Sequence, residues 1–65
     1  MSAEPPRRIR VLLVDDHGLF RAGLARLLEV ETDIELVAHC GSISEALDVV
    51  AAVPIDVVLL DYDLG

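Results

Sequence analysis

The stretch that decides the fold is the final eleven residues, Ile55-Asp56-Val57-Val58-Leu59-Leu60-Asp61-Tyr62-Asp63-Leu64-Gly65. Its central run, residues 57–60, is apolar without polar alternation, which is typical of a strand buried on both faces of a sheet. Asp61 follows that run directly. Because α/β proteins place their chemistry at the carboxyl ends of strands, we expect Asp61 to act as a nucleophile at the edge of a sheet.

Composition limits the class of protein. A chain of 65 residues with 54% hydrophobic residues is one small domain or a piece of a larger one. Twelve acidic residues against five Arg give a net charge of −7, which argues against non-specific binding to DNA or to an anionic membrane. One cysteine, Cys40, excludes an internal disulfide, and no run resembles a signal peptide or a membrane span. We therefore predict a cytoplasmic protein with an aliphatic core.

The first half of the chain predicts a leader, a strand and a helix. Residues 1–8 contain Pro5-Pro6 and are predicted to be a leader, and residues 9–65 to be the folded unit. Residues 9–15 are typical of a buried strand, which ends in Asp15-Asp16. From residue 17 to about residue 30, apolar residues recur at helical spacing and are expected to face the core. These residues are Phe20, Leu24, Leu27 and Leu28.

The second half predicts a strand, a helix and the final strand. Residues 34–40 alternate in part, which indicates an edge strand with one wetter face, and the apolar face is expected to hold Ile34, Leu36, Ala38 and Cys40. After a turn at Gly41, Ser42 and Glu45 have the spacing of a capping box, so a helix should begin there. Its expected apolar face consists of Ile43, Ala46, Leu47, Val50 and Ala51.

The order strand, helix, strand, helix, strand predicts an α/β fold with a parallel three-stranded sheet. Right-handed crossovers and an edge position for the second strand give the order 2-1-3, with two helices. The carboxyl ends of strands 1 and 3 then meet where the chain changes direction across the sheet. Asp15, Asp16 and Asp61 should therefore be neighbours, although they are distant in the sequence.

Three convergent carboxylates predict a cation site. Like charges repel at short range, and a few carboxylates with water ligands suit Mg²⁺ better than an all-protein Ca²⁺ cage. One cysteine and two separated histidines make a Zn²⁺ site improbable. Beside a cation, Asp61 can accept a phosphoryl group and form an aspartyl-phosphate. The alternative for Asp15 and Asp16 is a structural role as helix N-caps.

The sequence also resembles a known family. Val11-Leu12-Leu13-Val14-Asp15-Asp16-His17 and Val57-Val58-Leu59-Leu60-Asp61-Tyr62-Asp63-Leu64 resemble the receiver domain of two-component response regulators. The stretch from Asp15 to Leu24 is similar to the LuxR/NarL-type subclass, whose members carry a C-terminal helix-turn-helix DNA-binding domain. Ser44-Glu45-Ala46-Leu47 matches the family's second helix.

The resemblance assigns roles to residues. It implies that Asp61 is the phosphoacceptor, that Asp16 and Asp61 are Mg²⁺ ligands, and that Asp15 acts on the metal through water. It also implies that Asp63 offers its backbone carbonyl to the metal. The phosphodonor would be a phosphohistidine on a sensor histidine kinase, or a small acyl phosphate. Such a module is not an enzyme beyond autophosphorylation and autodephosphorylation, and DNA binding would belong to a C-terminal domain absent here.

The chain departs from the family in its extent. The family has a flavodoxin-like sheet of order 2-1-3-4-5, with a Ser or Thr after strand 4 and a Lys after strand 5. This chain contains no Lys and is expected to form only three strands, so we interpret it as the N-terminal half of a receiver domain. An unpaired apolar edge on strand 3 would invite homo-oligomerisation.

Two alternatives remain open. A structural or dimerising pseudo-receiver would never accept phosphate. A haloacid-dehalogenase-like phosphatase also has Asp-x-Asp after an apolar strand, but Gly-Thr usually follows there, whereas Leu64-Gly65 follows here. Incubation with acetyl phosphate and Mg²⁺ separates the three interpretations. A receiver domain predicts a covalent adduct, a phosphatase predicts turnover without an adduct, and a pseudo-receiver predicts no reaction.

Overall fold

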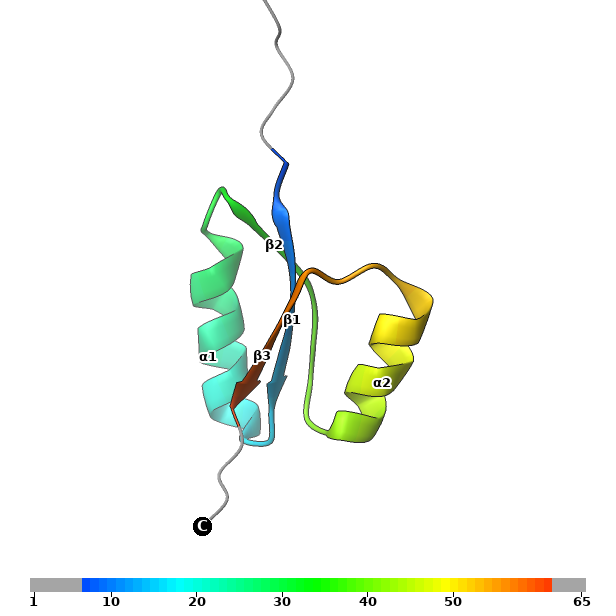
Figure 1. The fold of residues 1–65 in the computed structure, drawn as a ribbon. Coiled ribbons are helices and arrows are strands. Elements are labelled where there is room, and N and C mark those ends of the chain that lie inside the picture. The colour runs from blue at the N-terminus through cyan, green and yellow to red at the C-terminus, as the bar shows by residue number, and fades with distance from the viewer. Residues whose placement is uncertain (1–6, 62–65) are drawn as a thin grey trace, which may run out of the picture.

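The structure, a computed structural model, describes residues 7–61. Its elements alternate between strand and helix along the chain (Figure 1). They are β1 (Ile9–Asp15), α1 (Gly18–Glu29), β2 (Ile34–Cys40), α2 (Ile43–Ala52) and β3 (Val57–Asp61). The predicted α/β class and the element order are confirmed.

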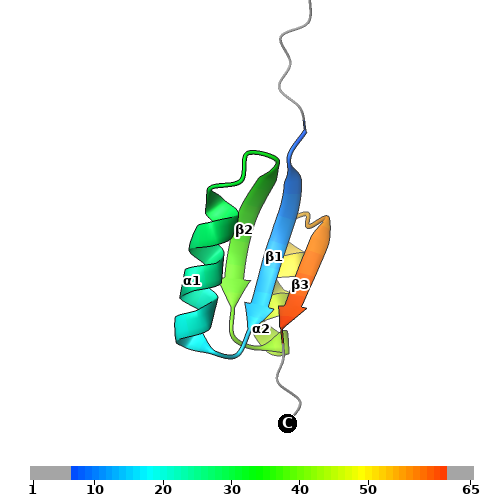
Figure 2. The same cartoon turned by 90° about the vertical axis from the view of Figure 1, so that its left-hand side faces the viewer.

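The three strands form one parallel sheet in the order β2-β1-β3, as predicted. Helix α1 covers one face of the sheet and α2 covers the other (Figure 1). All three strands run in the same direction, so their carboxyl ends lie at one edge (Figure 2). This edge receives the acidic residues that the sequence singles out.

The central strand β1 forms the core. Residues 11–14 are at most 2% exposed, and burial of each such aliphatic side chain contributes about 1.5–3 kcal/mol. Leu12 and Val14 pack with Cys40 and Ala46 on the α2 side. The strand buried on both faces is therefore β1.

The expectation that residues 57–60 are buried on both faces is wrong. These four residues of β3 are 39–57% exposed. The reason is that neither α1 nor α2 makes backbone contacts with β3, and β3 pairs only with β1 within residues 7–61. The strand assignment itself is correct, because the apolar run does form a parallel strand.

Hydrogen bonds at the amino end of the sheet fix the register of β3. The backbone N–H of Arg10 donates to the Asp56 carboxylate at 2.9 Å, and the N–H of Asp56 donates to the Arg10 carbonyl at 2.8 Å. The Arg10 guanidinium also donates to the Pro54 carbonyl at 2.7 Å. Five residues further along each strand, this register brings Asp61 beside Asp15.

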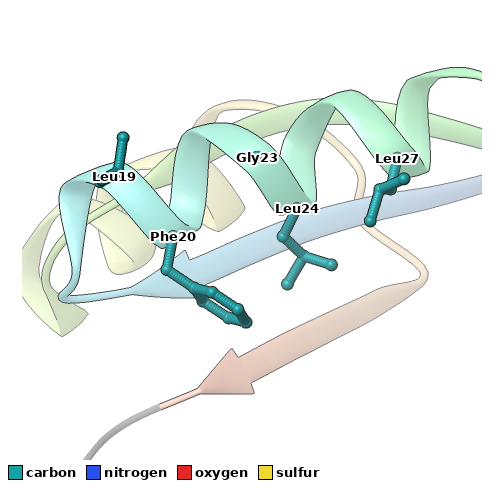
Figure 3. Close-up of a pocket in the computed structure, with 5 residues that line it drawn as sticks. All are labelled: Leu19, Phe20, Gly23, Leu24 and Leu27. Carbon is teal, nitrogen blue, oxygen red and sulfur yellow. The ribbon is translucent and has the colours of Figure 1, made fainter.

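The predicted helix α1 exists, but its apolar stripe is only partly buried. Ala25 is the one fully buried residue of this helix, whereas Phe20 is 56% and Leu27 is 66% exposed. Together with Leu19, Gly23 and Leu24, these two residues line a groove of about 350 Å³. Phe20, Leu24 and Leu27 extend from α1 on the side where β3 lies (Figure 3).

Helix α2 begins where the capping box predicts, with Ser42 as its N-cap residue. The Ser42 hydroxyl accepts from the backbone N–H of Glu45 at 3.2 Å, and the Glu45 carboxylate accepts from the backbone N–H of Gly41 at 3.3 Å. The predicted apolar face is partly wrong, since Leu47 is 61% exposed and Val49 packs against the core instead. The helix is therefore rotated relative to the predicted face.

Candidate metal and phosphoacceptor site

The site begins where β1 ends and the chain turns into α1. Asp15 is the last residue of β1 and is fully buried. Its Oδ1 accepts from the backbone N–H of His17 at 2.9 Å, a local bond that favours a turn. The side chain of Asp15 therefore helps to direct the chain from the strand into the helix.

The second carboxylate oxygen of Asp15, Oδ2, is buried and lacks a hydrogen-bond partner within the described part of the chain. A buried carboxylate oxygen without a partner carries a desolvation penalty of a few kcal/mol. A bound cation would offset that penalty.

Asp16 and His17 complete a cluster at the surface. The His17 Nδ1 atom lies 2.9 Å from Asp16 Oδ1 and 3.5 Å from Asp15 Oδ1. The side chains of Asp16 and His17 are 42% and 59% exposed, so solvent reaches the cluster from one side. One possible ligand atom from each of the three residues lies within 4.8 Å of the others.

The helix-cap alternative for the two acids does not describe this geometry. The N-cap residue of α1 is His17, and no side chain forms a capping hydrogen bond there. Asp16 instead pairs with His17, and Asp15 accepts from a backbone N–H that precedes the helix. Both carboxylates thus keep oxygens that the helix does not use.

Asp61 lies beside this cluster in the sheet. It pairs with Asp15 in the β1–β3 ladder, and residues that pair in neighbouring parallel strands project to the same face. Asp61 is exposed, and its carboxylate is not among the three residues whose ligand atoms lie within 4.8 Å of one another. The predicted convergence of β1 and β3 is therefore present at the level of the backbone. Asp63 and Tyr62 lie outside the described residues.

Arg21 supports the site from α1, a role that the sequence patterns did not predict. Its Nη1 donates to the backbone carbonyl of Asp15 at 2.9 Å, and its Nε is buried without a partner among the described residues. A Cβ atom at Gly41 would lie 2.5 Å from Arg21 Nη1, so Gly41 leaves room for the guanidinium. The sequence offered one signal for this contact. Residue 21 lies one helical turn after residue 17, so its side chain can reach back to the turn between β1 and α1.

His17 is a further member of the cluster that the sequence patterns did not predict, although it lies in the stretch that resembles the LuxR/NarL-type subclass. Its position directly after two acidic residues was the signal. The residues present fit a divalent cation, since two carboxylates and an imidazole meet at one point and one buried carboxylate oxygen lacks a partner in the described range.

Comparison with known proteins identifies the family. Residues 11–65 match the response regulator receiver domain. The chain is 42% identical to the nitrate/nitrite response regulator protein NarP of Escherichia coli over 55 residues, which cover 85% of this chain and 26% of that protein. It is 43% identical to the transcriptional regulatory protein LiaR of Bacillus subtilis over 82% of this chain and 25% of the relative.

A third relative is the DNA-binding transcriptional activator DevR/DosR of Mycobacterium tuberculosis, at 41% identity over 86% of this chain and 26% of that protein. The chain thus spans about a quarter of the length of these curated relatives. No solved structure gave a significant match. Neither helix described in residues 7–61 is long and apolar enough to cross a membrane. The chain belongs to the response regulator receiver domain family, in the part of it that is similar to NarL-type transcriptional regulators.

Proposed function

We propose that this chain is the N-terminal half of a receiver domain and that Asp61 accepts a phosphoryl group from a sensor histidine kinase. Receiver domains of such regulators interact with sensor histidine kinases and precede DNA-binding domains. The observation that carries the proposal is the register that pairs Asp61 with Asp15 at the carboxyl edge of the sheet. Any DNA binding would come from a C-terminal domain of the longer protein.

The reaction follows from the nucleophile. An oxygen of the Asp61 carboxylate attacks the phosphorus atom of a phosphohistidine, the P–N bond breaks, and its electron pair returns to the imidazole nitrogen of the donor. The product is an aspartyl-phosphate on this chain. Exposure of Asp61 supports this role, because a phosphodonor must reach the carboxylate from solvent.

The acidic cluster would hold the cation that this transfer needs. Receiver domains bind Mg²⁺ at an acidic site, and when bound the ion neutralises charge on the transferred phosphoryl group. We assign direct ligation to Asp16 and Asp61, water-mediated contact to Asp15, and a backbone carbonyl to Asp63. The partnerless Asp15 Oδ2 and the three-residue cluster support the assignments to Asp15 and Asp16.

Receiver domains of transcriptional response regulators are generally non-enzymatic. We propose that this chain has no activity beyond its own phosphorylation and dephosphorylation, and that it works in the cytoplasm. A pseudo-receiver without phosphotransfer is the competing function. The exposure of β3 is the observation that favours an interaction role of that kind.

Intact-mass spectrometry after incubation with acetyl phosphate tests the proposal. We expect an adduct of about 80 Da, the mass of one phosphoryl group, that requires Mg²⁺ and is absent in Asp61→Asn. Asp33→Asn is a matched control, because Asp33 is an exposed acid in the turn before β2. Acetyl phosphate turnover without an adduct would indicate a phosphatase, and no reaction would indicate a pseudo-receiver.

We also propose that copies of this chain associate through β3. All five residues of β3 are exposed, and one edge of the strand has no neighbouring strand within residues 7–61. An open apolar edge exposes backbone N–H and C=O groups that another strand can pair with.

A further inference from the structure

We propose that His17 supplies an imidazole ligand to the acidic site, so that this site prefers the borderline transition-metal ions Co²⁺, Ni²⁺ and Zn²⁺ over Mg²⁺. The inference rests on the proposed cation site at Asp15 and Asp16 and concerns which ion that site selects. It gives a role to a residue that phosphotransfer does not require.

The separations within the cluster match the edges of a metal coordination shell. With metal–ligand distances of about 2.1 Å, neighbouring ligands lie about 3.0 Å apart in an octahedron and about 3.4 Å apart in a tetrahedron. His17 Nδ1 lies 2.9 Å from Asp16 Oδ1 and 3.5 Å from Asp15 Oδ1. One nitrogen and two carboxylate oxygens thus lie within 4.8 Å of one another, so small side-chain rotations would let a single ion contact all three.

A second observation, independent of the imidazole, points to a cation. Asp15 is fully buried, and its Oδ2 has no hydrogen-bond partner among the described residues. Buried carboxylates in native proteins are normally paired or bind metals. The site therefore contains a negative oxygen that an ion would stabilise.

The imidazole is free to act as a ligand without damage to the helix. His17 is the N-cap residue of α1, but its side chain makes no capping hydrogen bond. Its side chain is 59% exposed, so it does not belong to the core. Rotation of the ring costs the contact with Asp16, which coordination of both residues to one ion would replace.

Ligand chemistry then sets the order of preference. Carboxylates and water suit Mg²⁺, whereas imidazole suits Ni²⁺, Zn²⁺ and related ions, whose affinity for mixed nitrogen and oxygen sites is also higher. A nitrogen ligand therefore adds affinity for Co²⁺, Ni²⁺ and Zn²⁺ and little for Mg²⁺. Removal of the imidazole should affect the two classes of ion differently.

Isothermal titration of the chain with CoCl₂ and with MgCl₂ at constant pH tests this inference. We expect wild-type protein to bind Co²⁺ at least about tenfold more tightly than Mg²⁺. His17→Gln should lose about tenfold or more in Co²⁺ affinity, change the visible absorption of bound Co²⁺, and alter Mg²⁺ affinity by less than about twofold. His39→Gln is the control, because His39 is the other histidine and is exposed on β2.

The outcomes separate this inference from the proposed function. Unchanged Co²⁺ affinity in His17→Gln, with Mg²⁺ still bound, would overturn the role of His17 and leave the Mg²⁺ site intact. Equal losses of both ions in His17→Gln, or an equal Co²⁺ loss in His39→Gln, would also overturn it. Binding of neither ion by the wild type would overturn both proposals. Circular dichroism of each variant establishes that the fold is retained.

Discussion

Asp15 has two opposing effects at the end of β1. Its Oδ1 shapes the turn into α1, whereas its buried Oδ2 has no partner within residues 7–61. We expect Asp15→Asn to raise the free energy of unfolding by about 1 kcal/mol without divalent cations, because the buried charge is removed while the acceptor oxygen is kept. Urea denaturation with and without Mg²⁺ measures this.

The same variant should lose the stabilisation that Mg²⁺ gives to the wild type, because binding to the folded state alone raises stability. Asp16→Asn serves as the comparison. Its side chain is 42% exposed, so loss of its charge should change stability without Mg²⁺ by less than about 0.5 kcal/mol. If Asp15→Asn destabilised the metal-free chain, the inference that the buried charge of Asp15 lowers the stability of that chain would be wrong.

Gly41 leaves room for the Arg21 guanidinium. No glycine in residues 7–61 has a positive φ, but a Cβ at residue 41 would lie 2.5 Å from Arg21 Nη1. We expect Gly41→Ala to displace the guanidinium from the Asp15 carbonyl and to lower the free energy of unfolding by about 1 kcal/mol. Thermal or urea denaturation checks the sign and size of this change.

A double-mutant cycle with Arg21→Met isolates the cause. In the Arg21→Met background, Gly41→Ala should cost much less, because the displaced hydrogen bond is already absent. Gly23→Ala is a matched control of opposite sign, since a Cβ added at Gly23 would meet nothing within 4 Å and alanine stabilises a helix interior by about 1 kcal/mol. Additive costs for Gly41→Ala and Arg21→Met would contradict this explanation.

Among the elements, α2 depends on its N-cap. The Ser42 hydroxyl accepts from the Glu45 N–H at 3.2 Å, so Ser42→Ala should lower the free energy of unfolding by about 1 kcal/mol. Ser44→Ala removes an equivalent hydroxyl from an exposed helical position and should be neutral or slightly stabilising. Equal effects of the two substitutions in denaturation experiments would argue against the cap.

The edge strand β2 shows where element prediction from the sequence fails. Alternation predicted that Leu36 and Ala38 share a face, but Leu36 pairs with Val11 and Ala38 pairs with Leu12, because the register shifts between Val11 and Leu12. Such a bulge places two residues that are separated by one position on opposite faces. Side-chain period alone cannot reveal it, since the bulge depends on pairing with β1.

At the scale of the molecule, the sequence predicted the topology and the meeting of β1 and β3 correctly. These follow from local patterns and from the handedness of crossovers. The exposure of Phe20, Leu27 and residues 57–60 could not be predicted from the sequence. Burial depends on what packs against an element and not only on the apolar residues of the element itself. The contributions of His17 and Arg21 depend on side-chain geometry that spacing only suggested.

The exposed β3 strand leads to a prediction about association. Val58 is 46% exposed on β3, so Val58→Lys should reduce concentration-dependent association by placing a charge on the open edge. Val30→Lys is the matched control, because Val30 is 73% exposed and is the C-cap residue of α1, a helix that makes no backbone contacts with β3. Sedimentation velocity over a concentration series measures the effect, and a wild-type chain that stays monomeric throughout would contradict the proposed interface.

Asp61, at the carboxyl edge shared by β1 and β3, is the proposed acceptor of the phosphoryl group. Borohydride reduction of the acetyl phosphate-treated chain, followed by peptide mass spectrometry, tests this role most directly, because reduction converts an aspartyl-phosphate to homoserine. We predict homoserine at position 61, only in samples that contained Mg²⁺. Homoserine at Asp15 or Asp16 instead, or no conversion at any aspartate, would contradict the account.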